Sequence, residues 1–257
     1  MTNTFTPAST NPAKQKMLRG EPAIGAACGL GAPLAAEMLS RAGFDFILVD
    51  NQHGAWTDET STDGLRYICL GSAVPMVRVR WNDFSAIGQL LDRGALGLVV
   101  PMVNSTEEAR AAAFAARYPP RGGRSSGGAL TLHFGSDYDQ WVNDQLFLAV
   151  QIESVKAVEH AEEILGVDGI DGCWIGPADL ARSMGVDRST TAGAKAHREM
   201  ILRVAEACRK TGKIAGVSGD VDLRFWVQNG FRFITASWDG GLLLEGAKQV
   251  FNFLSMD

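Results

Sequence analysis

Two carboxylates follow apolar runs at positions where two parallel strands would end. Gln151-Ile152-Glu153 closes the run that begins at Leu146, and Gly176-Pro177-Ala178-Asp179 follows the run that ends at Ile175. The separation fits one strand–helix–strand unit, in which both strands point the same way. Glu153 and Asp179 are therefore predicted to emerge side by side at one end of a sheet.

Two adjacent carboxylates either share a proton or hold a cation. Hard oxygen ligands in this number suit Mg²⁺ or Mn²⁺, with Co²⁺ or Zn²⁺ as further alternatives, and water and substrate fill the other positions. Two less specific roles stay open, because Glu153 could cap the helix that follows it and Asp179 could begin the helix at Leu180.

The turn Gly176-Pro177-Ala178 runs into a predicted helix start. The first N–H groups of a helix have no partner within the helix, so they form a site for a carboxylate. A cation beside such a turn favours a chelating 2-oxo acid, whose carboxylate and keto oxygens would bind the cation together.

Other polar side chains follow the remaining apolar runs. They are Asp50, Gln52 and His53, then Arg78, Arg80, Asn82 and Asp83, then Ser237 and Asp239. An imidazole, a guanidinium and two carboxylates are what metal-assisted proton transfer beside a carbonyl group requires. His53 could instead be structural, and Arg78 could belong to a structural salt bridge. Arg80, two residues on, would face the same side as Arg78.

Eight apolar runs alternate with helix-like stretches, which predicts a single-domain (β/α)₈ barrel whose active site is built where the strands end. The predicted strands are Ala23–Cys28, Phe46–Asp50, Pro75–Val79, Gly97–Pro101, Leu146–Ile152, Gly172–Ile175, Ile214–Val217 and Phe233–Ala236. The predicted helices are Leu34–Ala42, Ser85–Asp92, Thr106–Arg117, Ser154–Leu165, Ala194–Thr211, Val221–Asn229 and Gly241–Leu254. A doubly wound sheet is disfavoured, because Gly25–Gly31 does not match the dinucleotide-binding pattern Gly-x-Gly-x-x-Gly.

Residues 1–16 are polar and are expected to form a loosely ordered tail before a barrel domain spanning 17–257. The longest irregular stretch, Tyr118–Trp141, precedes the Glu153 strand. Loops of this length inside a domain are usually functional or disordered, so an active-site lid is one interpretation of it.

Composition excludes several classes of partner. The 257 residues carry a net charge of −5 with no basic block, which argues against nucleic acid. No apolar stretch approaches the roughly 18–20 residues that span a bilayer. The four cysteines are scattered, without the paired spacing of a metal site, as expected of buried free thiols in a reducing cytoplasm.

Beyond these single features, the chain resembles the class II, metal-dependent pyruvate aldolases, in the family of 4-hydroxy-2-oxoheptanedioate aldolase and 2-dehydro-3-deoxyglucarate aldolase. The resemblance runs from about Ala23 to the C-terminus in a set of ordered, correctly spaced segments. They are Phe46–His53, Val77–Asp83, Gln89–Ala95, Val100–Val103, Arg117–Arg124, Val150–Glu153 and Gly169–Leu180.

The resemblance implies a role for each matching residue. It makes Glu153 and Asp179 the metal ligands, Gln151 a contact of bound pyruvate, and the Gly176-Pro177-Ala178 turn the holder of its carboxylate. His53 is implied as the general base, acting through water, and Arg78 rather than Arg80 as the residue that stabilises the enolate. Asp92, within a predicted helix, is implied to make the histidine more basic across a subunit contact.

The resemblance also implies a barrel of the phosphoenolpyruvate/pyruvate type whose last helix is exchanged between subunits of a homo-hexamer, a trimer of dimers. The chain departs from the family at Gln52, where many members have Glu, and at Ser237-Trp238, where many have Gly and a small apolar residue. A less negative pocket and a different choice of aldehyde are the expected consequences.

The predicted reaction is reversible aldol cleavage of a 4-hydroxy-2-oxo acid to pyruvate and an aldehyde, through a pyruvate enolate with a metal as Lewis acid. A Schiff-base mechanism is disfavoured, because Lys213, the only lysine beside a predicted strand, lies at the strand's start. Two alternatives remain: an acyl-CoA lyase of the citrate-lyase type, with Arg121 and Arg124 near the CoA phosphates, and a non-catalytic barrel that binds a 2-oxo acid.

Overall fold

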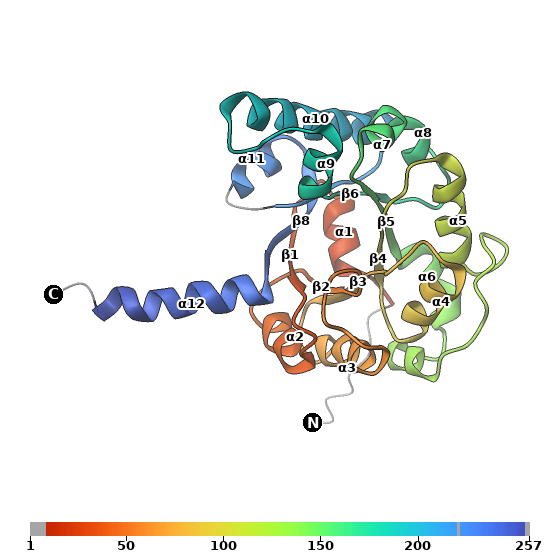
Figure 1. Ribbon diagram of the computed structural model, residues 1–257. Helices are drawn as coiled ribbons and strands as arrows, with labels where there is room; N and C mark the ends of the chain where they lie inside the picture. The colour runs from red at the N-terminus through yellow and green to blue at the C-terminus, as the bar shows by residue number, and fades with distance from the viewer. Residues whose placement is uncertain (1–8, 220–221, 255–257) are drawn as a thin grey trace.

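The computed structural model describes residues 9–219 and 222–254, and eight parallel strands close into a barrel in chain order (Figure 1). The strands are β1 Ala23–Cys28, β2 Phe46–Asp50, β3 Val74–Arg78, β4 Gly97–Val100, β5 Phe147–Ile152, β6 Gly172–Ile175, β7 Ala215–Ser218 and β8 Phe231–Trp238. The predicted (β/α)₈ barrel is confirmed, and each strand lies within three residues of its predicted bounds at either end.

Helices follow the strands and cover the outside of the barrel (Figure 1). They are α1 Pro12–Leu18, α2 Pro33–Ser40, α3 Asp58–Ile68, α4 Phe84–Asp92, α5 Thr106–Ala116, the 3-10 helix η1 Ala129–Phe134, α6 Tyr138–Gln145, α7 Val155–Glu159, α8 Ala161–Leu165, α9 Pro177–Met184, α10 Thr191–Thr211, α11 Leu223–Gln228 and α12 Asp239–Leu254. Within the described ranges, no helix is long and apolar enough to cross a membrane.

Large rings and small residues fill the inside of the barrel together. Phe233 packs against Phe46 and Phe147, with ring centroids 4.6 and 4.9 Å away. Gly25 makes room for them, since a Cβ there would lie 2.3 Å from the Phe46 ring. This packed interior leaves the strand ends as the place for chemistry.

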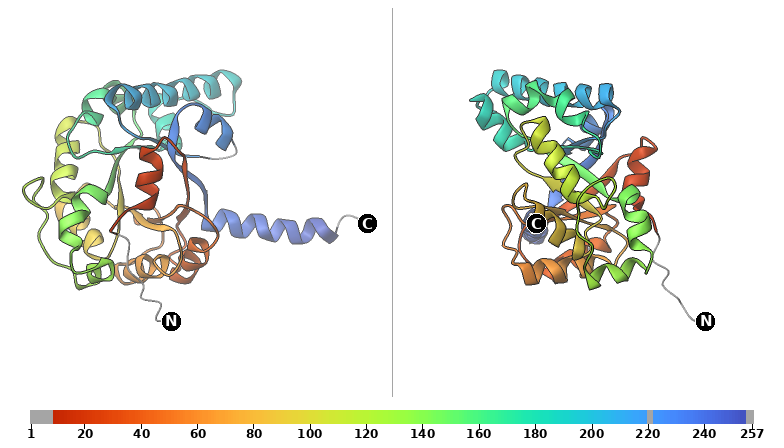
Figure 2. Two further views of the ribbon diagram at one scale, coloured as in Figure 1. Left: turned by 180° about the vertical axis from the view of Figure 1, so that it is seen from behind. Right: turned by 90° about the vertical axis from the view of Figure 1, so that its right-hand side faces the viewer.

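Helix α1 corrects the prediction of a loose tail through residue 16. Asn11 caps the helix, and its side-chain amide also donates to the Leu96 carbonyl at 2.9 Å. The buried Lys14 ammonium donates to the carboxylate of Asp171 at 2.8 Å and to the Leu146 carbonyl at 2.8 Å. Both partners lie next to strand starts, so α1 lies across that end of the barrel, as Figure 2 shows. The part of the predicted tail before residue 9 lies outside the described residues.

The segment Tyr118–Trp141 lies away from the strand ends of its own barrel. It follows α5 and leads into β5, and helices of this barrel end near the strand starts. Phe134 lies against Gly94, just before β4, and Gly128 lies against Asp92, the last residue of α4. These contacts place the segment at the end of the barrel opposite the predicted site.

Helix α12 begins at the end of β8 and then leaves the barrel (Figures 1 and 2). Its contacts with the barrel are with β1, β8 and α2. Several of its apolar side chains are exposed, and they recur at helical spacing. They are Leu243, Leu244, Val250 and Phe251.

Candidate active site

Glu153 directly follows β5 and is buried and firmly held. One carboxylate oxygen accepts the Met102 N–H at 2.9 Å, and the other accepts the side-chain amide of Gln151. Burial raises the pKa of Glu153 above its ordinary value; the Met102 hydrogen bond lowers it, the Asp179 charge raises it and the Arg78 charge lowers it. The ends of β5 and β6, which pair in register at Ile152 and Ile175, meet beside this carboxylate.

Gly176 connects β6 to α9 and lies against the side chains of Gln151 and Glu153. A Cβ at Gly176 would lie 2.8 Å from both the Gln151 amide nitrogen and a Glu153 carboxylate oxygen. The backbone at Gly176 is extended, with φ −90°, so it is the space and not the dihedral angle that requires glycine.

The turn is also supported from behind. The ring N–H of buried His197, on α10, donates to the Pro177 carbonyl at 2.8 Å. Pro177 is the first residue of α9 and lacks an N–H, so Ala178 and Asp179 present the free N–H groups of the first turn. The structure therefore places a turn with free N–H groups beside Glu153.

Asp179 lies in the first turn of α9, and its side chain is half exposed. It pairs with Arg182 on the same helix at 2.9 Å, and that arginine is largely exposed. Exposed ion pairs three residues apart are worth little, so Asp179 is free to change partners.

The residues around Glu153 fit a hard divalent cation. They offer two carboxylates and the Gln151 amide oxygen, which is buried and has no hydrogen-bond partner among the described residues. Nowhere in residues 9–219 and 222–254 do three or more acidic, histidine or cysteine side chains gather in a metal-like cluster. A cation bound here would therefore complete its shell with water and substrate oxygens, the usual arrangement for Mg²⁺ or Mn²⁺.

Arg78, the last residue of β3, is buried in the mouth of the barrel. Its register partner on β2 is Asp50, and the guanidinium Nε donates to that carboxylate at 2.9 Å, with a second bond from Nη2. The guanidinium also lies over the Trp174 ring, 5.2 Å from its centroid. Arg80 lies past the strand and is exposed, whereas Arg78 lines the cavity at the strand ends.

His53 lies in the loop after β2 and is exposed. The Asp50 carboxylate accepts the backbone N–H groups of Gln52 and His53, at 3.1 and 3.2 Å, so one residue orients both Arg78 and this loop. The Gln52 amide oxygen is buried without a hydrogen-bond partner among the described residues.

Asp92 is not brought to the mouth of its own barrel. It is the last residue of α4, a helix of about 13 Å that begins just after β3 and runs back toward the strand starts. Its carboxylate accepts a hydrogen bond of 2.8 Å from the buried Arg124, which also lies over the Tyr118 ring at 4.4 Å. A catalytic role for Asp92 therefore requires the mouth of another subunit.

A cavity of about 240 Å³ opens beside Arg78 at the ends of β1, β6, β7 and β8. Its lining residues are Ala27, Gly29, Asp50, Arg78, Trp174, Ser218, Gly219, Thr235, Ser237 and Trp238. The Thr235 hydroxyl accepts the Trp174 indole N–H at 3.0 Å. Ser237 and Trp238 thus lie at the mouth, as the sequence predicted.

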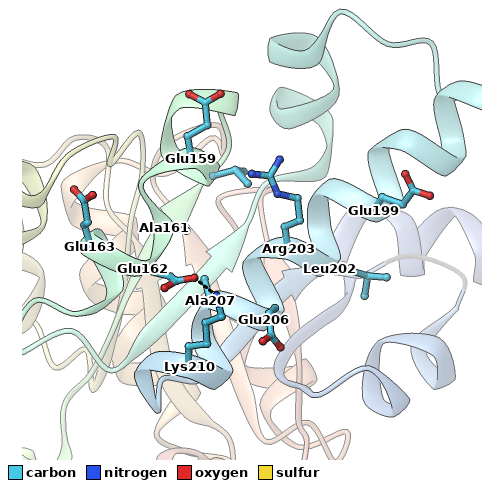
Figure 3. Close-up of a pocket in the computed structure, with 11 residues that line it drawn as sticks. Glu159, Ala161, Glu162, Glu163, Glu199, Leu202, Arg203, Glu206, Ala207 and Lys210 are labelled. Atoms are coloured by element: carbon cyan, nitrogen blue, oxygen red, sulfur yellow. Dashed lines mark hydrogen bonds and ion pairs between the residues drawn. The ribbon is translucent and has the colours of Figure 1, made fainter.

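A larger hollow lies elsewhere, outside the barrel between α7, α8 and α10 (Figure 3). It measures about 720 Å³ and is lined mainly by glutamates, with Arg203 and Lys210. Glu162 and Lys210 form an exposed ion pair across it at 2.6 Å. None of the predicted site residues lines it, so its size is not a guide to the chemistry.

Asp50 and Asp239 were underrated by sequence reasoning. Asp50 was one of several polar residues after a strand, and its role depends on its register with Arg78. Asp239 accepts the N–H groups of Gly29 and Leu30, at 2.9 and 3.0 Å, and so ties the loop after β1 to the start of α12. The only sequence signal was their position at a strand end.

Comparison with known proteins agrees with this geometry. The family described as HpcH/HpaI aldolase/citrate lyase matches residues 29–246. A hydroxypyruvate/pyruvate aldolase of Delftia acidovorans is 39% identical over 243 residues, covering 92% of this chain and 90% of that protein. A 4-hydroxy-2-oxo-heptane-1,7-dioate aldolase of Escherichia coli is 37% identical over 247 residues, covering 93% and 92%. The crystal structure of an HpcH/HpaI aldolase/citrate lyase family protein from Burkholderia cenocepacia has a TM-score of 0.86, with 31% identity, covering 96% of this chain and 100% of that one.

Proposed function

The chain belongs to the HpcH/HpaI aldolase/citrate lyase family, and on that premise we propose that it cleaves a 4-hydroxy-2-oxo acid reversibly to pyruvate and an aldehyde, using Glu153 and Asp179 to hold a divalent cation. It is a carbon–carbon lyase of the class II pyruvate aldolase type. The proposal rests chiefly on one observation: Glu153, Gln151 and the Gly176 bend lie in contact at adjacent strand ends, beside Arg78.

Each residue has a distinct task in the proposed reaction. A divalent cation, when bound by Glu153 and Asp179, supplies Lewis acidity at the keto oxygen. The free N–H groups of Ala178 and Asp179 bind the substrate carboxylate. Gln151 offers its amide to the bound 2-oxo acid.

Proton movement begins at His53, which takes the 4-hydroxyl proton through a water molecule. The C3–C4 bond then breaks, its electron pair passes into the enolate of pyruvate, and the aldehyde leaves; a proton returned to C3 completes pyruvate. Arg78 donates to the developing oxyanion through a guanidinium nitrogen that Asp50 does not use. One preorganised donor of this kind is worth about 2.7–4 kcal/mol.

Asp179→Asn tests the metal site. We expect turnover of a 4-hydroxy-2-oxo acid to fall by about 100-fold or more, since removal of one preorganised stabilising group typically costs ~10²–10³ in kcat. The melting temperature should not change, because among the described residues the side-chain partner of Asp179 is the exposed Arg182. Arg182→Gln is the control, since it removes the ion pair and keeps the carboxylate. Undiminished turnover in Asp179→Asn would remove the metal site from the mechanism.

Neither alternative function gains support. The acyl-CoA lyase hypothesis needs Arg121 and Arg124 near the mouth, whereas within a single barrel both belong to the segment at the strand starts. Arg121 pairs there with Asp144 and the buried Arg124 with Asp92. A non-catalytic barrel would be expected to have lost a ligand or the base, and none is missing here.

Assembly as a homo-hexamer, a trimer of dimers with α12 exchanged between subunits, is part of the proposal. The exposed apolar residues of α12 support it, as does the position of Asp92, which needs a second subunit to reach a mouth. A cytoplasmic location is supported by four free cysteines, of which Cys173 and Cys208 have sulfurs 3.4 Å apart without a disulfide bond.

A further inference from the structure

We propose that the cavity beside Arg78 is the subsite for the aldehyde portion of the substrate, and that it selects a short, uncharged, hydroxylated aldehyde through Trp238 and the hydroxyl groups of Ser218 and Ser237. The inference rests on the proposed function and extends it to the class of the second product. Four features of the cavity carry it.

The position of the Trp238 indole is set by two glycines. A Cβ at Gly240 would lie 2.1 Å from the indole ring, and one at Gly241 would lie 2.6 Å from its nitrogen. The indole therefore lies against the first turn of α12, and any larger residue at either position would displace it. The glycine pair and the tryptophan form one structural unit at the wall of the cavity.

Trp238, which forms the aromatic wall of the cavity, is tied to β1 and to the loop that follows β1. Trp238 pairs in register with Ala27 on β1, and the register of β1 and β8 shifts between Gly25 and Ala26. Asp239 binds the backbone N–H groups of Gly29 and Leu30. A small side chain at Ala27 and a large one at Trp238 therefore leave a slot with one flat aromatic side.

The rest of the lining is rich in hydroxyl groups. Ser218 and Ser237 line the cavity and are half-buried. Their hydroxyl groups have no hydrogen-bond partner among the described residues. Thr235 uses one acceptor position for the Trp174 indole N–H, so its own hydrogen can still be donated. Partly buried hydroxyls without partners favour a ligand that brings hydroxyl groups of its own.

The lining offers no unpaired cation to a charged aldehyde. Arg78 is the only basic residue of the cavity, and Asp50 already holds it through two hydrogen bonds. A carboxylate on the aldehyde would enter beside the Asp50 carboxylate without a counterion of its own. The chemistry of the cavity therefore selects an aldehyde that carries hydroxyl groups over one that carries a carboxylate.

A panel of three aldehydes tests the selection, with kcat/KM for addition to pyruvate as the readout. Glyceraldehyde carries hydroxyls, propanal has the same number of carbons without them, and succinic semialdehyde carries a carboxylate. We expect the wild-type enzyme to prefer glyceraldehyde over each of the others by about tenfold. Ser237→Ala should lower the preference over propanal about two- to tenfold, the range expected for one hydrogen bond.

Gly240→Ala tests the aromatic wall without touching a residue of the slot itself. We expect it to displace the indole and to reduce the glyceraldehyde preference. Gly246→Ala is the matched control, because it lies on the same helix and a Cβ there would meet nothing within 4 Å. Trp238→Ala, which removes the indole outright, should reproduce the effect of Gly240→Ala.

Exchange of pyruvate methyl protons for deuterium, measured without aldehyde, separates the two proposals. If the wild-type enzyme catalyses exchange but prefers propanal or succinic semialdehyde, the subsite is wrong and the proposed function stands. If Gly240→Ala and Gly246→Ala give the same preference, the aromatic wall does not select and the inference is overturned. If the wild-type enzyme catalyses no exchange, the proposed function fails, and the subsite with it.

Discussion

Glu153 and Asp179 differ in how firmly the protein holds them. Glu153 is buried between the Met102 N–H and the Gln151 amide, whereas Asp179 is half exposed and bound only to Arg182. In the proposed metal site, one oxygen group is therefore preorganised, and the other would have to change partners to reach the cation. Gly176 is the residue on which this arrangement depends, because the Gln151 and Glu153 side chains occupy the space of its missing Cβ.

Gly176→Ala is expected to weaken metal binding and leave the fold intact. The added methyl group would displace the ends of Gln151 and Glu153, while the φ of −90° accepts alanine. We expect Mn²⁺ to bind about 10–100-fold more weakly, the range typical for disturbed neighbours of metal ligands. Isothermal titration with Mn²⁺ measures this.

Gly88→Ala provides the matched control for that change. Gly88 lies in α4 away from the site, and a Cβ there would meet nothing within 4 Å. Equal Mn²⁺ affinities in the two variants would show that the Gly176 contact does not position the ligands.

Single site residues were predictable where they follow a strand, and unpredictable where their role depends on a partner. Arg78 and Arg80 are both arginines and, two residues apart on a strand, would face the same side. They differ because β3 ends at Arg78 and Arg80 lies beyond it. Asp50 acquires its role from a register with β3 that no local pattern encodes. A role for Asp92 was proposed only from the family resemblance, because α4 carries this residue away from the strand ends.

At the level of elements, strands were predicted well because they are continuous apolar runs, and helices less well. The helix α3 was missed because its buried face includes Ser61 and Gly64 as well as Leu65 and Ile68. Gly64 is buried against the Trp56 ring, and Ser61 donates to the Asn51 amide oxygen at 2.8 Å. Hydrophobic periodicity cannot reveal a face built from small and polar residues.

Helix α1 was missed for a related reason, because its attachment to the barrel is partly ionic. Asp171, just before β6, accepts hydrogen bonds from Lys14 at 2.8 Å and from Arg117 at 2.9 Å, and both cations are buried. It also accepts the Leu148 N–H at 2.7 Å. One carboxylate therefore joins α1, the end of α5 and β5 at the strand starts.

Asp171→Asn is expected to destabilise the barrel by about 3–5 kcal/mol, since it leaves two buried cations without a counterion. Urea unfolding measures the change. Asp168→Asn is the control, because it alters the charge equally at an exposed position nearby. Equal stabilities in the two variants would contradict a structural role for the ionic cluster.

The same variant should show a characteristic pH dependence. Burial already lowers the pKa of Lys14 below 10.5, and the Asp171 charge opposes that shift, so removing the charge lowers the pKa further. Between the folded and unfolded pKa values the unfolded chain binds more protons, so stability rises with pH. The loss of unfolding free energy in Asp171→Asn, relative to the wild-type protein, should therefore shrink as the pH is raised toward 10.5. A deficit that grows over that range would contradict this account.

For the whole molecule, α12 is the element that a single barrel leaves largely uncovered. It projects from the barrel (Figure 1). Its Leu244 and Phe251 side chains, seven residues apart, are exposed. Burying side chains of this size contributes about 1.5–3 kcal/mol each, so a second subunit has much to gain by covering them. Exchange of α12 and delivery of Asp92 to a neighbouring mouth would make assembly part of the active site.

Leu244→Glu combined with Phe251→Glu is expected to break the assembly. Light scattering coupled to size exclusion should show a hexamer for the wild-type protein and smaller species for the double variant. Gln249→Glu, an exposed polar position on the same helix, should leave the hexamer intact. A wild-type monomer, or an unchanged mass for the double variant, would contradict the proposed exchange.

In the proposed reaction, this barrel forms the enolate of pyruvate with a divalent cation held by Glu153 and Asp179. Proton NMR of pyruvate in D₂O tests it most directly, with Mg²⁺ or Mn²⁺ at non-broadening concentration and again with EDTA. The account predicts that the enzyme removes the methyl signal with metal and leaves it with EDTA. A methyl signal that persists with every divalent metal would contradict the account and leave His53 and Arg78 without their proposed roles.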